Sequence, residues 1–253
     1  MSVSSHKPLH HMLAWDTSGS AVSAALGRGD WLVQDAAVHV RSAQAAGGAQ
    51  ASATLLPALQ GLLQQAGLAW RDLHALVVGQ GPGAFTGLRT ACSLAQGLAL
   101  GLGDVPVIMV PSLMAMAHTA RLQRPDWRVA GEIHVALDAR MGQWYAASYR
   151  FDDTAAVPWQ VPQVVQPPAL WQPGQWLEVV QASQGQRLAY QLVPEAEWPA
   201  AIDVQVAPPS AQAMLHLAPA HWRAAQVASA ADVMPLYVRD EVAQTMAQRG
   251  VTS

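Results

Sequence analysis

The residues best placed for chemistry form a glycine-rich run at 79–89, which reads GQGPGAFTGLR. The apolar segment 76–78 before it is typical of a buried strand, and residues 90–100 after it contain no helix breaker except Gly97. A strand, a glycine turn and a helix in this order can aim backbone N–H groups at an anion such as phosphate. The same glycines could instead let two backbone segments pack closely together. The run therefore predicts either a nucleotide site or a structural junction.

Two aspartates could complete a phosphate site, because each ends an apolar, strand-like segment and precedes a turn. A carboxylate in this position can hold a metal–phosphate pair or accept a proton, or it can cap the amides of its own turn. The candidate residues of such a nucleotide loop are Asp16, Gly81, Gly83, Thr86, Arg89 and Asp138. Against this interpretation, Lys7 is the only lysine in the chain, and Arg89 is the only basic residue near the loop.

The other reactive side chains do not form a recognisable site. His6 and His10 have helical ligand spacing, but Pro8 between them disfavours a helix. No carboxylate stands at ligand spacing beside a histidine pair, so no metal site is expected. Cys92 lies in an apolar row typical of a protein core, and no serine occupies a G-x-S-x-G motif. We therefore expect no catalytic residue, metal or cofactor.

The chain is poor in charge, and this bears on its partners. Of its 253 residues 12% are charged, against roughly 25% in typical globular proteins. Between residues 42 and 103 the charged side chains are Arg71, Asp72 and Arg89. Such a segment is expected to be covered by a partner, or else reflects an alanine-rich composition. The net charge of −3 leaves no global basic field to attract nucleic acid.

The composition also predicts where the protein resides. A single cysteine excludes internal disulfides and fits a reducing cytoplasm. The N-terminus shows no signal peptide, and the most apolar stretch, 90–103, is shorter than the roughly 20 residues that span a bilayer. We expect a soluble, cytoplasmic protein without a membrane segment.

The pattern of apolar residues predicts two related α/β lobes, an N-terminal lobe at 1–105 and a smaller C-terminal lobe at 106–253. In the first lobe, we expect antiparallel strands at 11–16, 21–26 and 31–38, with a turn at 27–30. A helix over 55–66, closed by Gly67, should follow, and then the strand and helix around the glycine run. We expect the lobe to end with a strand at 105–110, followed by a helix capped by Ser112. In the second, we expect strands at 133–137, 144–151, 176–180 and 204–207, irregular chain over 151–175, a helix at 210–217, a short element at 235–239 and a frayed tail beyond about 241.

The helix after the glycine run carries a row of small residues, Gly87, Ala91, Ala95 and Ala99, one every four positions. Small residues in one row let another helix approach closely. This row predicts a helix–helix subunit interface. The alternative is burial between the sheet and the helix around Leu55 within the same chain.

Segments 13–18, 79–89, 95–99, 136–142 and 235–239 together resemble the TsaB family, the non-catalytic partner in bacterial threonylcarbamoyladenosine synthesis on tRNA. The resemblance implies a two-lobed, actin-like fold of the sugar kinase and heat-shock protein superfamily. It also implies a paralogous relation to TsaD, the catalytic subunit. TsaD carries a His-x-x-x-His metal site, whereas the corresponding region here, 47–54, has no histidine.

The same resemblance implies partners. These are TsaD in a heterodimer, the ATPase TsaE through the complex, a second copy when TsaD is missing, and tRNA only via the complex. The family's interface helices correspond here to about 51–66 and 86–100. The residues expected to include interface positions are Leu55, Leu59, Leu62, Gly87, Ala91, Ala95 and Leu98. The alternative function is a nucleotide-binding protein with its own ATP site at 79–89.

Overall fold

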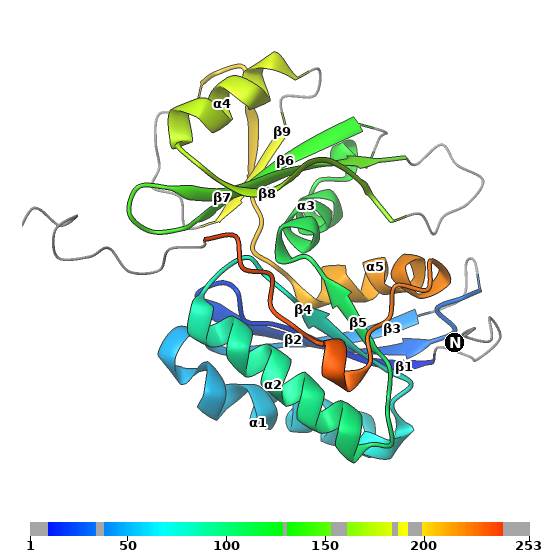
Figure 1. The fold of residues 1–253 in the computed structure, drawn as a ribbon. Coiled ribbons are helices and arrows are strands. Elements are labelled where there is room, and N and C mark those ends of the chain that lie inside the picture. Colours follow the sequence, from blue (N-terminus) through cyan, green and yellow to red (C-terminus); the bar gives the residue numbers. More distant parts are fainter. Residues whose placement is uncertain are drawn as a thin grey trace, which may run out of the picture.

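The computed structural model describes residues 10–33, 38–128, 131–152, 161–183, 187–191 and 199–239, which form two lobes, each built on a five-stranded sheet (Figure 1). The first sheet has the order β3-β2-β1-β4-β5. Its strands are β1 (His11–Asp16), β2 (Ala21–Gly29), β3 (Val38–Ala46), β4 (Ala75–Gly79) and β5 (Val107–Val110). The first three are antiparallel, and β4 and β5 run parallel to β1. The expected antiparallel meander is confirmed.

The second sheet repeats this topology, with the order β10-β9-β6-β7-β8. Its strands are β6 (Gly131–Asp138), β7 (Trp144–Phe151), β8 (Gln163–Trp171), β9 (Arg187–Gln191) and β10 (Asp203–Val206). In each lobe the first strand is central, pairs antiparallel with the second and parallel with the fourth. The expectation of two related α/β lobes is therefore confirmed.

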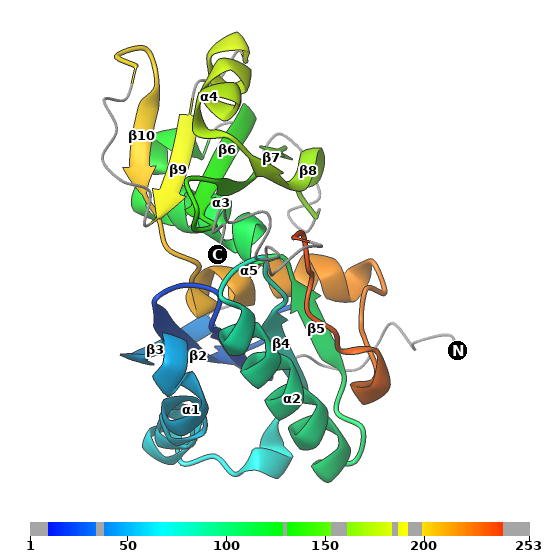
Figure 2. The same cartoon turned by 60° about the vertical axis from the view of Figure 1, so that its left-hand side comes forward.

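Helices cover both faces of each sheet, as Figures 1 and 2 show. The helices α1 (Ala51–Ala66) and α2 (Phe85–Gly101) pack on the outer face of the first sheet, and α4 (Pro173–Ala182) packs on the outer face of the second. Between the sheets lie α3 (Ser112–Gln123) and α5 (Ala211–Arg223). One apolar core runs through this middle layer and joins residues of both sheets, such as Met12 and Val135.

The boundary expected near residue 105 does not coincide with the sheets. The strand β5 begins at Val107 yet completes the first sheet, where it pairs with β4. The helix α5 follows the second sheet in sequence but packs back on β1, β2, β4 and β5. The chain therefore crosses between the lobes more than once.

Two expectations in the first lobe are wrong. The segment 27–30 is not the hairpin turn, because β2 continues to Gly29, and the third strand begins at Val38 instead of Trp31. Trp31 is buried, and its indole lies so close to Gly27 that a Cβ at that position would overlap it. Gly27 is therefore a packing site for an aromatic ring and not a turn residue. The left-handed Gly67, with φ of 66°, closes α1 as expected.

In the second lobe, the strand expected at 176–180 is instead the helix α4. Trp176 and Val180 lie one turn apart and are both buried against the sheet, and Pro173 occupies the helix's first turn. The segment expected to be irregular contains β8, an edge strand that tolerates two consecutive prolines. The sequence pattern predicts no strand at 187–191, where the structure has β9. The tail beyond about 241 lies outside the described residues.

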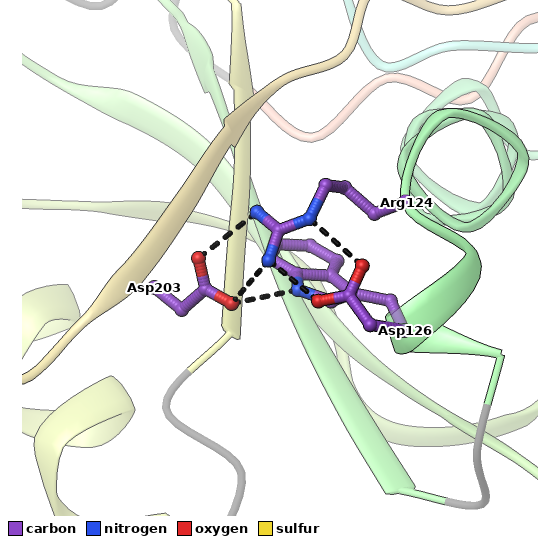
Figure 3. A network of polar contacts seen from close by, with 4 residues as sticks. Arg124, Asp126 and Asp203 are labelled. Atoms are coloured by element: carbon purple, nitrogen blue, oxygen red, sulfur yellow. Dashed lines mark hydrogen bonds and ion pairs between the residues drawn. The ribbon is translucent and has the colours of Figure 1, made fainter.

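A polar network holds the edge strand β10 on the second lobe (Figure 3). The guanidinium of Arg124, just after α3, donates to both carboxylate oxygens of Asp203 at 3.1 and 2.9 Å and also pairs with Asp126. The indole Nε1 of the buried Trp127 donates to Asp203 Oδ2 at 2.8 Å. Bidentate, charge-assisted bonds of this kind fix geometry as well as adding energy.

Candidate functional site

Asp16 ends β1 and is almost fully buried. Its Oδ1 accepts hydrogen bonds from the backbone N and Oγ of Ser18 at 2.8 and 2.6 Å, and its Oδ2 accepts one from Ser112 Oγ at 2.6 Å. Burial raises the pKa of this carboxyl, and the hydrogen bonds from Ser112 and Ser18 oppose that rise. Both carboxylate oxygens are therefore used within the protein.

Ser112 ties three segments together at this point. Its hydroxyl donates to Asp16 and accepts from the backbone N of Gly81 at 3.0 Å. The residue is the first of α3, and its side chain makes no capping bond to the helix, so the expectation of a serine cap is wrong. A capping serine accepts a backbone N–H of its own helix, but the Ser112 oxygen accepts the N–H of Gly81 instead, while the Ser112 hydroxyl proton is donated to Asp16.

The glycines of the run are explained by close packing. A Cβ built on Gly79, Gly83 or Gly87 would overlap atoms of residues 16–18. The same two segments are hydrogen-bonded, because Ala84 N donates to the carbonyl of Ser18 at 2.8 Å and the Thr17 hydroxyl donates to that of Gly87 at 2.7 Å. These three glycines thus let the turn after β1 press against the start of α2.

A cavity of about 590 Å³ lies between the lobes beside this junction. Its lining comes from three parts of the chain: residues 18–20, 48, 82–85 and 88–89 in the first lobe, residues 137–140 with Tyr145 in the second, and the C-terminal segment 236–239. The volume falls within the range of small-molecule sites. The charged lining residues are Arg89, Asp138, Arg140 and Arg239, so positive charge prevails.

The C-terminal segment 236–239 bridges the lobes across this cavity. Leu236 N donates to the carbonyl of Gln80 at 2.7 Å, and the Tyr237 ring packs against Phe85 with centroids 5.4 Å apart. Arg89 lies 3.8 Å above the Phe85 ring, and its Nε donates to the Tyr237 hydroxyl at 3.0 Å. On the other lobe, Arg239 donates to Gln143 Oε1 at 2.9 Å. The sequence predicts a short element at 235–239, and the family resemblance includes this segment, but neither indicates its contacts with residues distant in the chain.

The structure brings together only part of the expected nucleotide loop. Gly83, Arg89 and Asp138 line the cavity, whereas Asp16 and Gly81 are buried and do not line it. Thr86 is exposed and lines a shallow groove on the outer side of α2. Asp138 Oδ1 accepts from the backbone N of Arg140 at 2.9 Å, which is the turn-capping alternative for this carboxylate.

The seven expected interface residues lie mostly inside the chain. Leu55, Leu59, Leu62, Gly87, Ala91 and Ala95 are buried, and Leu98 is half-buried. The row of small residues faces inward from α2 and packs against the first sheet and α1. This is the alternative considered above for the row. The solvent-facing side chains of the two helices are their neighbours, and they include Leu56 at 42%, Phe85 at 40% and Leu100 at 65% exposure.

Within the described part of the chain, no group of three or more histidine, cysteine, aspartate or glutamate side chains could hold a metal ion. The helices described there are also too short or too polar to cross a membrane.

Two lobes with one repeated five-strand topology, and a cavity between them, define an α/β protein of two-lobed, actin-like fold. A family model described as "TsaD: tRNA N6-adenosine threonylcarbamoyltransferase" matches residues 44–245. Within this group, the chain belongs to the TsaB family.

Several curated relatives carry the name tRNA threonylcarbamoyladenosine biosynthesis protein TsaB. The protein from Escherichia coli (strain K12) is 33% identical over 202 residues, which cover 75% of this chain and 80% of the relative. That from Haemophilus influenzae is 31% identical over 243 residues, covering 91% and 94%. A solved structure, YeaZ from Pseudomonas aeruginosa, superposes with a TM-score of 0.69 at 26% identity and covers 90% of this chain and 99% of that one.

Proposed function

We propose that this chain is a non-catalytic, activating subunit for the threonylcarbamoylation of the adenosine next to the anticodon in tRNA. In this proposal it binds TsaD and, through TsaD, TsaE, and forms a homodimer when TsaD is missing. The names of its relatives support a role in this biosynthesis. Its place of action would be the cytoplasm, where tRNA is modified.

The observation that carries the proposal is the outer face of α1 and α2. Arg89 is the only charged residue in these two helices. Leu56 of α1 and Leu100 of α2 expose 42% and 65% of their surface. Exposed apolar side chains on helices with few charges are typical of protein–protein interfaces. The buried row beneath them supports this face from inside the lobe.

The activating role rests on differential affinity. A subunit shifts its partner toward the active arrangement only if it binds that arrangement more tightly than the inactive one. The chain's own reactive groups support a non-catalytic role. Asp16 is held by three donors, and burial raises the pKa of the Cys92 thiol to about 11, which keeps it protonated at neutral pH.

The experiment that tests this proposal is size-exclusion chromatography with light scattering on the chain alone and mixed with TsaD. The wild type should form a homodimer that gives way to a one-to-one heterodimer. Leu56→Glu should fold normally yet fail to bind TsaD, because a charge would be desolvated at the interface. Val164→Glu is a matched control, since Val164 is 48% exposed on β8 of the other lobe. Equal TsaD binding by both variants would contradict the proposed surface.

A second candidate function is nucleotide binding in the cavity between the lobes. Three arginines, Arg89, Arg140 and Arg239, line that cavity and would favour a phosphate. Opposing this, Arg89 and Arg239 already donate to Tyr237 and Gln143, and Asp16 is not available to a ligand. Calorimetry with ATP and magnesium tests it, and the absence of heat at millimolar nucleotide would end the idea.

A further inference from the structure

Basic side chains line up across four neighbouring strands at one end of the first sheet. In the register of the sheet, Arg28 of β2 lies opposite His11 of β1 on one side and His39 of β3 on the other. His74, just before β4, donates its backbone N–H to the carbonyl of His11 at 2.8 Å. Arg41 lies two residues along β3 from His39, on the same face. We call His11, Arg28, His39, Arg41 and His74 the basic row.

The row lies on the sheet face that α1 and α2 cover, beyond the end of α1. Two residues along the same strands, Leu13, Leu26 and Leu76 belong to the core beneath these helices. Arg28 Nη1 donates to the carbonyl of Ala66, the last residue of α1. A helix C-terminus carries partial negative charge that favours nearby cations. The fold thus collects the row at an end of α1 that helps to hold it in place.

Little in the described chain neutralises this charge. Four members of the row, His11, Arg28, His39 and Arg41, line an open depression of about 770 Å³ with His10, and none of the described lining residues carries a carboxylate. Among the described residues, neither Arg28 nor Arg41 forms an ion pair. Burial lowers the pKa of His74, which keeps this ring neutral at pH 7, and the Oδ2 of the nearby Asp72 accepts from the backbone N of Ala69 at 2.8 Å.

An external anion would therefore stabilise this surface. Neighbouring strands lie about 4.8 Å apart, and Arg28 and Arg41 are diagonal neighbours on β2 and β3, so their like charges repel. Four strands place the row over about 15 Å. That length exceeds a single phosphate group and fits a polymer with repeated negative charges. The depression is open, and its basic side chains lie across one end of the sheet. It therefore suits the backbone of a charged polymer better than a small molecule that needs an enclosed site.

We propose that the basic row binds the phosphodiester backbone of RNA and gives this chain a direct contact with tRNA. This inference rests on the proposed function for its RNA, and it differs from the expectation that tRNA is reached only via the complex. The chain's net charge is −3, so the attraction for RNA comes from this local group of basic side chains and not from the charge of the whole protein. Phosphate contacts of this kind position an RNA without reading its sequence.

The test measures binding of fluorescently labelled, unmodified tRNA by anisotropy, with the full chain alone and with its TsaD complex, between 50 and 200 mM KCl. The double variant Arg28→Gln, Arg41→Gln should bind more weakly. The slope of log affinity against log salt should fall by about 1 for each arginine removed. Arg150→Gln is the control, because Arg150 is an exposed arginine in β7 of the other lobe. The double variant should melt no lower than this control, since it removes like charges from adjacent strands.

Three results would overturn the proposal. The first is an unchanged affinity and salt slope in the double variant, or no tRNA binding by the wild type in either form. The second is loss of poly-glutamate binding in that variant with tRNA binding intact, which would assign the row to an acidic protein segment. The third is a double variant that fails both to co-elute with TsaD and to bind tRNA. Normal TsaD co-elution alongside unchanged tRNA binding would reject the basic row and leave the proposed function standing.

Discussion

At the scale of single residues, Asp16 illustrates how a carboxylate that could do chemistry becomes a structural group. Asp16→Asn should reduce the free energy of unfolding by about 1–3 kcal/mol, because a charged acceptor of three buried hydrogen bonds is lost. Urea denaturation measures this change. Asp104→Asn is the control, since Asp104 is exposed and should give no change. Equal stability of the two variants would mean that the carboxylate is not a structural acceptor.

Residue types in the sequence predicted part of this site and not the rest. A run with glycines at 79, 81, 83 and 87 can be identified from the sequence as a sharp junction. Whether the glycines face a phosphate or residues 16–18 depends on a partner segment about 60 residues away, which spacing along the chain does not reveal. The contact of Tyr237 with Phe85 and Arg89 is hidden for the same reason, because it joins positions about 150 residues apart.

At the scale of elements, the row of small residues on α2 makes a sharp prediction. Ala95 is fully buried in the isolated chain, between α2 and the rest of the first lobe. Ala95→Glu should therefore lower the melting temperature strongly, because it buries an unpaired charge at a cost of several kcal/mol. Ser93→Glu changes an exposed position of the same helix and should leave the melting temperature nearly unchanged. A soluble, stable Ala95→Glu chain would mean that this face opens to a partner.

Elements were predictable where their pattern is periodic and local. The spacing of the leucines predicts the helix α1, and the apolar runs predict the strands β1, β4 and β6. The helix α4 was mistaken for a strand because Trp176 and Val180 can be buried in either form, and only the neighbouring Pro173 favours a helix start. The edge strand β8 was missed because its two prolines are tolerated only at a sheet edge, a place that the sequence does not specify.

At the scale of the whole molecule, one core joins the lobes. Apolar residues of both sheets, with α3 and α5 between them, form a continuous cluster (Figure 1). The C-terminal segment 236–239 adds a second connection at the cavity. Buried histidines lie within this arrangement, and they make the stability of the protein depend on pH.

Acidification should destabilise the protein below about pH 6.5. Burial, with the charges of His216, Arg121 and Arg128, lowers the pKa of His118 to about 3 from its ordinary 6.5. Burial likewise lowers the pKa of His134 to about 4. Below pH 6.5 the unfolded chain takes up these protons while the native chain does not. The free energy of unfolding therefore falls as the pH decreases from 6.5 toward 4, by up to about 1.4 kcal/mol per pH unit for each histidine.

Denaturant unfolding between pH 4.5 and 7.5 measures this dependence. His118→Phe should keep the stability at pH 7.5, because the His118 Nδ1 is buried without a described partner and the ring stacks on Phe151. The same variant should show a shallower loss of stability in acid, since the unfolded chain has one proton fewer to gain. The exposed His39→Gln variant should retain the full slope. Asp16 acts in the opposite direction, because its raised pKa lets the native state bind a proton more readily than the unfolded chain. An acid slope in His118→Phe equal to that of the wild type would show that this histidine does not contribute to the pH dependence of folding.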